Sequence, residues 1–171
     1  RPARHRAAAT AGVLLAAALA VALALPYLAE RDVARAGASW AADPAGALKR
    51  LDRAAQLNAL SAKPDLTAGV IALELDRPAV ALQRFDRAVA RAPQEWFAHF
   101  GRGLAHAAQR RPAAARAEYL AARRLSPSEP LLDEALRRVG GRRPLLAREA
   151  FAILRARVDR LTGESERAGA P

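Results

Sequence analysis

The chain repeats itself with a period of 34 residues, and this period constrains the fold more than any other feature. Pro44, Pro78 and Pro112 are each separated by this interval. The same offset aligns three columns of apolar residues: Ala47, Ala81 and Ala115; Leu51, Phe85 and Tyr119; Ala54, Ala88 and Ala122. Proline suits the first turn of a helix, because its missing N–H is not needed there and its φ is already helical. Alanines seven residues apart share one helix face, where a neighbouring backbone approaches closely and the bulky residue fills the remaining gap.

A second set of columns is present in two of the three copies. Gly69 aligns with Gly103, and Pro93 aligns with Pro127. Glycine in the first helix of a unit permits a close helix crossing, and the late proline ends the unit. We therefore divide residues 29–129 into three repeats: a degenerate copy at 28–61, followed by 62–95 and 96–129.

This order of glycine, alanine, aromatic residue and proline resembles the tetratricopeptide repeat, a helix–turn–helix unit of 34 residues. The units 62–95 and 96–129 carry all of these features, whereas the first unit has Arg35 and Ala59 in place of the glycine and the final proline and Leu51 in place of the aromatic residue. The resemblance implies an all-α solenoid of about three repeats.

Residues 130–161 are predicted to form capping helices. A helix over 130–139 has an apolar face and is stopped by Gly140 and Gly141. Pro144 opens a second helix whose apolar residues alternate at spacings of four and three: Ala147, Phe151, Leu154, Val158 and Leu161. We expect this helix to cover the last repeat, and the alternative is a homo-oligomer in which helix 144–161 pairs with a second copy. Residues 162–171 are short and polar, which predicts a disordered tail.

The N-terminal segment has the pattern of a membrane signal. A basic stub at 1–6 precedes the uncharged residues 7–29. A span over 7–28 is long enough to cross a hydrocarbon core of about 30 Å. Arginines before the span place the stub in the cytoplasm and the repeats outside it, in a single-pass topology. The alternative is a secreted protein, because Ala22, Leu23 and Ala24 form an A-x-A cleavage site.

No catalytic constellation is found in the sequence. The chain has no cysteine, which excludes thiol nucleophiles and the commonest zinc sites. His99 and His106 are seven residues apart, not the four of a two-histidine metal site. The carboxylates Asp65, Glu74 and Asp76 fall at predicted helix starts or ends. We therefore predict no catalytic residue, no metal, no cofactor and no enzymatic activity in this segment.

The resemblance also implies a concave surface lined by the first helix of each repeat. The residues at these positions form the candidate groove: Lys63, Leu66, Val70, Leu73, Phe97, Phe100, Leu104 and Ala107. An open apolar surface of this kind binds a protein or peptide partner. Equally, Phe97, Phe100 and Leu104 can pack beneath the last helix or against the first repeat. Members of the family that hold a partner's C-terminal carboxylate use Lys, Asn and Arg here, so the apolar residues argue against a chaperone-tail receptor.

Basic residues concentrate in the third repeat. The candidate basic patch comprises Arg102, Arg110, Arg111, Arg116, Arg123 and Arg124. It suits an acidic protein, an anionic lipid headgroup or an acidic glycan. The alternative is a solvated helix face. The membrane segment argues against nucleic acid as the partner.

The whole layout resembles the C-terminal tail of bacterial O-antigen ligase-like membrane proteins. The resemblance is carried by the basic stub, the single span, the short repeat array and the segments 57–61 (Leu-Asn-Ala-Leu-Ser) and 96–99 (Trp-Phe-Ala-His). It implies an extracytoplasmic scaffold of a cell-envelope glycan protein, with any catalysis in a membrane region upstream. The alternative is an independent single-pass adaptor for envelope assembly or secretion.

Overall fold

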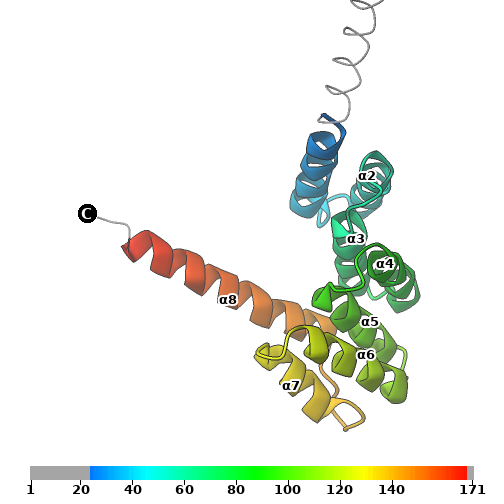
Figure 1. Ribbon diagram of the computed structural model, residues 1–171, viewed down its shortest axis with the longest axis vertical. Coiled ribbons are helices and arrows are strands. Elements are labelled where there is room, and N and C mark those ends of the chain that lie inside the picture. The colour runs from blue at the N-terminus through cyan, green and yellow to red at the C-terminus, as the bar shows by residue number, and fades with distance from the viewer. Residues whose placement is uncertain (1–23, 169–171) are drawn as a thin grey trace, which may run out of the picture. The chain divides into compact units, whose positions relative to one another are not determined.

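The computed structural model describes residues 24–168, with side chains through Arg160, and every regular element in this range is a helix (Figure 1). A helix covers residues 24–39. It is followed by α2 (Pro44–Leu57), α3 (Lys63–Glu74), α4 (Pro78–Arg91), α5 (Trp96–Ala108), α6 (Pro112–Leu125), α7 (Pro130–Arg138) and α8 (Ala147–Ala168). The chain divides into two compact units on either side of the Pro64–Asp65 bond. The predicted all-α class is confirmed.

The repeating prolines begin the second helix of each unit, as the period predicts. Pro44, Pro78 and Pro112 are the first residues of α2, α4 and α6. The residue before each proline is the N-cap. Asp43 caps α2 by accepting a hydrogen bond from the Gly46 N–H at 2.8 Å, whereas the arginines that cap α4 and α6 make no such side-chain bond.

The period is also visible in the backbone turns. Asp76 and Arg110 lie 34 residues apart, and both have positive φ, 56° and 58°. Each follows the first helix of its repeat. The next N–H reaches back to a helix carbonyl, from Arg77 to Ala72 at 2.8 Å and from Arg111 to His106 at 2.9 Å. The left-handed conformation lets the next N–H bond to one of the last carbonyls of the helix, although neither Asp76 nor Arg110 is glycine.

In each repeat of the second unit, the glycine of the first helix lies against the aromatic ring of the second helix. A Cβ on Gly69 would lie 2.7 Å from the Phe85 ring, and a Cβ on Gly103 would lie 2.3 Å from the Tyr119 ring. Atoms at these separations overlap, so the first helix of the repeat needs glycine wherever the second helix presents a ring. The predicted close crossing is confirmed.

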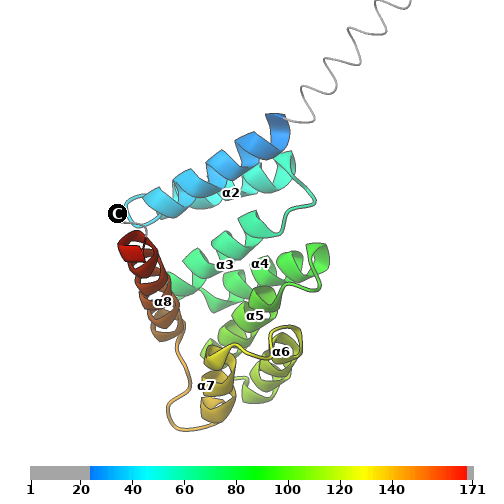
Figure 2. The ribbon, with the colours of Figure 1, turned by 60° about the vertical axis from the view of Figure 1, so that its left-hand side comes forward.

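The core of the second unit runs from α3 to α8. Helices α4, α5, α6 and α7 pack in succession, and α8 packs against α5 (Figure 2). The largest buried side chains of this unit include Phe85, Phe100, Leu104, Tyr119 and Leu132, none more than 1% exposed. In the first unit, α2 buries Ala47, Leu51 and Ala54, the three residues of the repeat columns.

The helices after the last repeat differ from the sequence-based prediction in extent. Glu129 caps α7 through the Leu131 N–H at 3.0 Å, as Glu95 caps α5 through the Phe97 N–H at 3.3 Å. The repeat register therefore continues one helix beyond the predicted third unit. Helix α8 extends to Ala168, into the segment for which the sequence predicted a disordered tail, because extending a formed helix costs much less than nucleating one.

The predicted stub at 1–6 and most of the predicted span at 7–28 lie outside the described residues. Between residues 24 and 168, no helix combines the length and the apolar composition that a membrane crossing requires. Residues 24–28 belong to the helix over 24–39, which continues through the predicted boundary between span and repeats.

Candidate functional site

The structure brings the candidate groove residues of α3 and α5 into one apolar cluster with α8. Leu66, Val70, Phe97 and Ala107 are partly buried. Deeper in the cluster, the exposed fractions of Leu73, Phe100 and Leu104 are 6%, 0% and 1%. The ring of Phe100 lies 5.8 Å from the ring of Tyr119, centroid to centroid. Phe100 and Leu104 are therefore core residues, and the partly exposed side chains are those available to a partner.

Lys63 is not part of this cluster. It lies in the first compact unit, is exposed, and forms an ion pair with Glu30 at 3.0 Å. Its side chain has a structural partner within its own unit.

The first turns of α8 cover the apolar face of α5. Phe151 is 4% exposed, and its ring centroid lies 6.3 Å from that of Phe97. Leu145 and Ala150 are buried in the same cluster. Further along α8, Val158 is 58% exposed, and the later turns project away from α5–α7 (Figure 1).

Two glutamates next to this face receive arginines from α8. Arg157 donates from Nη1 to both carboxylate oxygens of Glu129, at 2.7 and 2.8 Å. Arg155 lies 3.4 Å from Glu74, and Arg148 donates to the Glu74 carbonyl at 3.3 Å. The two carboxylate side chains are only 10% and 13% exposed. Sequence analysis gave neither glutamate this role.

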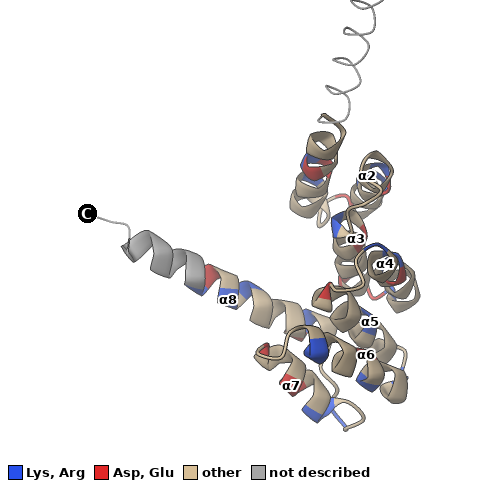
Figure 3. Ribbon diagram, viewed as in Figure 1, with Lys and Arg blue, Asp and Glu red and all other residues tan. Residues whose placement is uncertain are grey.

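The candidate basic patch is divided by ion pairs. Arg102 lies 3.0 Å from Asp86 and 3.4 Å from Glu118, and Arg123 lies 3.7 Å from Asp133. Acidic residues are interspersed among the basic ones over α5–α7 (Figure 3). The other members of the patch are exposed: Arg110, Arg111, Arg116 and Arg124.

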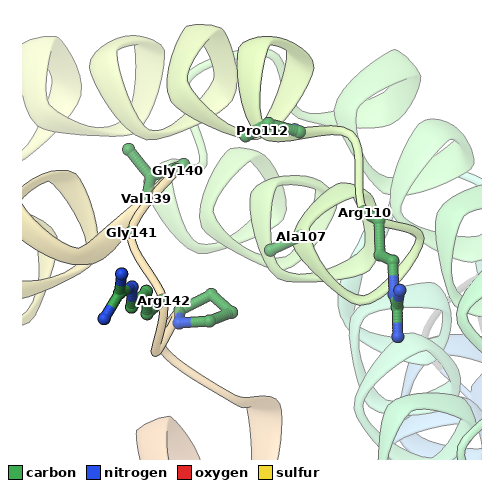
Figure 4. Close-up of a pocket in the computed structure, with 8 residues that line it drawn as sticks. Ala107, Arg110, Pro112, Val139, Gly140, Gly141 and Arg142 are labelled. Atoms are coloured by element: carbon green, nitrogen blue, oxygen red, sulfur yellow. The ribbon is translucent and has the colours of Figure 1, made fainter.

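One of the exposed arginines borders a pocket of about 410 Å³ between the α5–α6 turn and the α7–α8 loop. Arg110 and Arg142 lie on opposite sides of it, with Ala107 between them (Figure 4). The other lining residues are Pro112, Val139, Gly140, Gly141 and Pro144, so no acidic side chain contributes to the lining. The pocket combines an apolar floor with two cations, which suits a group with negative charge. Sequence analysis did not single out Arg142.

The titratable residues highlighted by the sequence have structural partners or lie in packed surroundings. His99 contacts Glu118 through Nδ1 at 3.0 Å and the Pro93 carbonyl through Nε2 at 3.3 Å. Burial is the main reason that the pKa of His106 is lowered, with Arg102 and Arg111 adding to the effect and Glu118 opposing it. Over residues 24–160, no three His, Asp or Glu side chains are close enough together to hold a metal ion.

Asp65 is an acidic residue whose environment the sequence did not predict. It is 1% exposed and forms ion pairs with Arg91 and, at 3.6 Å, with Arg84. A buried carboxylate needs such partners, because its desolvation is otherwise uncompensated. Asp65 therefore connects α3 to α4 and is a structural residue.

Comparisons with known proteins find one sequence profile and several solved structures that resemble this chain. Residues 66–130 match the sequence profile of the tetratricopeptide repeat. No curated protein sequence matches the chain significantly.

Solved structures with the same fold include three tetratricopeptide-repeat domains. The Arabidopsis OM64 domain is 21% identical, with a TM-score of 0.62 over 68% of this chain and 97% of that one. The first such domain of human RPAP3 is 18% identical, with a TM-score of 0.63 over 74% and 94%. The second human RPAP3 domain, in complex with the HSP70 peptide SGPTIEEVD, is 14% identical, with a TM-score of 0.60 over 67% and 97%. The fold is the tetratricopeptide-repeat solenoid.

Proposed function

We propose that the helices of the second unit form a non-catalytic scaffold that binds a peptide segment of another protein on the face formed by α3 and α5. The observation that carries this proposal is the apolar face itself: its partly exposed residues Leu66, Val70 and Phe97 are of the kind that accepts an apolar side chain, and α8 places Phe151 against Phe97. Repeat domains with this fold, such as those of RPAP3, have been solved with bound peptides, which supports a peptide as the partner class.

Substitutions at the rim of the groove test this proposal. Leu66→Glu and Phe97→Glu place a charge on partly exposed positions, so the buried core residue Phe100 is left intact. Val80→Glu on α4 is the matched control, because Val80 is 37% exposed and lies outside the groove cluster. Partners are captured from host extracts and quantified by mass spectrometry. We expect a partner whose recovery falls several-fold with both groove variants and is unchanged with the control. Equal recovery from all folded variants would contradict the proposal.

We further propose that residues 7–28 anchor these repeats in the cell membrane, with the N-terminus in the cytoplasm and the repeats outside. The long apolar segment and the arginines before it support this topology. The resemblance to O-antigen ligase-like proteins supports placing the chain at the C-terminal end of a cell-envelope glycan protein, and the alternative is an independent single-pass adaptor.

An immunoblot of host membranes with an antibody to the repeats separates these possibilities. A membrane-bound band several times larger than 18.2 kDa is the result expected for the tail of a larger protein. A membrane-bound band near 18 kDa indicates the adaptor. A band of that size or smaller in the soluble extracytoplasmic fraction indicates signal cleavage and secretion.

The pocket beside Arg110 and Arg142 supports a second candidate function, binding of an acidic glycan. Its two cations face no acidic lining residue, unlike the ion-paired part of the basic patch. The double variant Arg110→Gln, Arg142→Gln should elute from a heparin column at lower salt than the wild type. Arg87→Gln, which removes an exposed arginine of α4, is the charge control. Identical elution of the double variant and the single control variant would contradict a specific site.

A further inference from the structure

Helix α8 has the features of a peptide ligand for the groove. Phe151 supplies an aromatic side chain that is 4% exposed in the cluster, whereas Val158, two turns later, is 58% exposed. Arg148 and Arg155 are seven residues apart, so they lie on one face of the helix, and both reach Glu74. The docked part of α8 is therefore a short amphipathic helix with one aromatic anchor and a basic edge.

The groove has complementary chemistry. Its floor is apolar, and the carboxylates that contact arginines of α8 are those of Glu74 at the end of α3 and Glu129 at the start of α7. Nearer the start of α8, Arg138 of α7 pairs with Glu149. The carboxylates of Glu74 and Glu129 are both about nine-tenths shielded from solvent, so an unpaired state would be costly and a cationic partner is favoured. None of the candidate groove residues on α5 is basic. An acidic peptide would meet the two carboxylates with like charge and would find no basic side chain among the groove residues of α5.

From these contacts we infer that the groove selects a basic amphipathic helix with an aromatic anchor, and that the first half of α8 occupies this site within the same chain. The inference rests on the proposed peptide-binding function and specifies its partner. An external partner would place an aromatic side chain against Phe97 and basic side chains against Glu74 and Glu129. It would have to displace α8 in order to bind.

Occupation by α8 has a measurable consequence for affinity. A ligand binds only the fraction of molecules in which the site is free, so a groove that is occupied nine-tenths of the time weakens the apparent affinity about tenfold. A substitution that releases α8 should remove this penalty without altering the groove. Phe151→Ser does so, because the change lies on α8 and leaves Phe97 and both glutamates in place.

The test uses the full chain and a fluorescein-labelled synthetic peptide with the sequence of residues 144–160, followed by fluorescence anisotropy. We expect the peptide to bind the Phe151→Ser chain about tenfold more tightly than the wild type. A peptide carrying Arg155→Glu and Arg157→Glu should bind several-fold more weakly. The acidic peptide SRMEEVD, which is bound by the first repeat domain of Spaghetti (RPAP3), should not compete. If Phe151→Ser disturbs the fold, as judged by circular dichroism, Arg157→Glu is the second releasing variant.

Three results would overturn the inference. Equal affinity of the peptide for the wild type and both releasing variants would mean that α8 does not occupy the site. Tight binding of SRMEEVD in place of the basic peptide would show that the groove selects an acidic partner. A wild-type dimer that becomes monomeric with Phe151→Ser would place α8 in the groove of a second copy.

The capture experiment with Phe97→Glu is scored independently. Loss of capture combined with failure of the α8 peptide would reject this inference and retain the proposed function. Unchanged capture combined with tight binding of the peptide would reject the function and leave α8 as an intramolecular cap only.

Discussion

Toward the neighbouring repeat helices α4 and α6, Gly101 and Gly103 of α5 lie so close to the rings of Phe85 and Tyr119 that a Cβ on either glycine would lie 2.3 Å from a ring carbon. Toward α8, Phe97 meets Phe151 at a centroid distance of 6.3 Å, next to arginines that remain partly exposed. The first contact leaves no room for another occupant. The second combines a ring contact, other apolar contacts of α8 and ion pairs, which another helix of similar chemistry can replace. The comparison separates a packing that defines the fold from a packing that defines a binding site.

Filling the space at Gly103 should have the largest effect on stability. In Gly103→Ala the new Cβ overlaps the Tyr119 ring, and we expect a loss of about 2–3 kcal/mol in the free energy of unfolding. The first repeat suggests the compensating change, because it has Arg35 and Leu51 in these two columns. Urea denaturation of Gly103→Ala, Tyr119→Leu and the double variant measures the coupling. The double variant should lose at least about 1 kcal/mol less than the sum of the single losses. Simple additivity would show that the glycine and the ring are not in contact.

Removing the Phe151 ring should have a smaller and more local effect. In Phe151→Ala we expect a loss of about 2 kcal/mol or less, because α8 can undock while α3–α7 stay folded. Amide exchange should accelerate in residues 147–157 and remain unchanged in α5. Val158→Ala is the control, since that side chain is 58% exposed. Accelerated exchange throughout α4–α6 would mean that the groove side supports the fold as strongly as the repeat side.

Acid should affect the packing of α5 and the connection between α7 and α8 at different pH values. Burial lowers the pKa of His106, so the folded state favours the neutral ring. The stabilisation is complete above about pH 6.5 and is lost as pH falls below that value, because the unfolded chain then binds more protons. His106→Gln should flatten this part of the pH profile in urea denaturation. A profile between pH 7.5 and 5.5 that is unchanged by the substitution would contradict this assignment.

The connection between α7 and α8 should respond only to stronger acid. Arg138 donates to both oxygens of Glu149, at 2.6 and 2.8 Å, and this hydrogen bonding lowers the pKa of Glu149. The contribution of the pair is therefore present above about pH 4.3 and is lost as pH falls below it.

The smallest effect is expected at the Tyr119 hydroxyl. This group is buried, and within the described part of the chain it has no hydrogen-bond partner; burial also raises the pKa of Tyr119. Phe85 fills the same column without a hydroxyl. Tyr119→Phe should therefore raise the free energy of unfolding by up to about 1 kcal/mol. A loss of stability would indicate that the hydroxyl has a partner after all.

The sequence predicted the repeat side of α5 well, because its contacts are made within one period. The helix starts at Pro44, Pro78 and Pro112 and the close helix crossing at Gly103 follow from residues that recur every 34 positions. Each such contact joins residues close in sequence. Helix propensity and the residue type at each aligned position of the repeat are therefore sufficient to specify it.

The groove side was predicted only in part. The apolar stripe that includes Phe151 was identified, but the ion pair between Glu74 and Arg155 joins residues 81 positions apart. No periodic pattern encodes that pair, because α8 lies outside the repeat register. Arg142 was missed for the same reason: it reaches the pocket through the path of the α7–α8 loop.

The central claim, that α8 occupies the groove within its own chain, is tested most directly by the nuclear Overhauser effect between the rings of Phe97 and Phe151. The chain has only four phenylalanines, so these ring signals can be assigned by substitution. In uniformly labelled protein we predict a clear cross-peak between the two rings. In an isotope-filtered sample of mixed labelled and unlabelled chains, we predict that the cross-peak is absent. No cross-peak in the first sample would show that α8 is not docked, and a cross-peak in the second would show that the groove is filled by another copy.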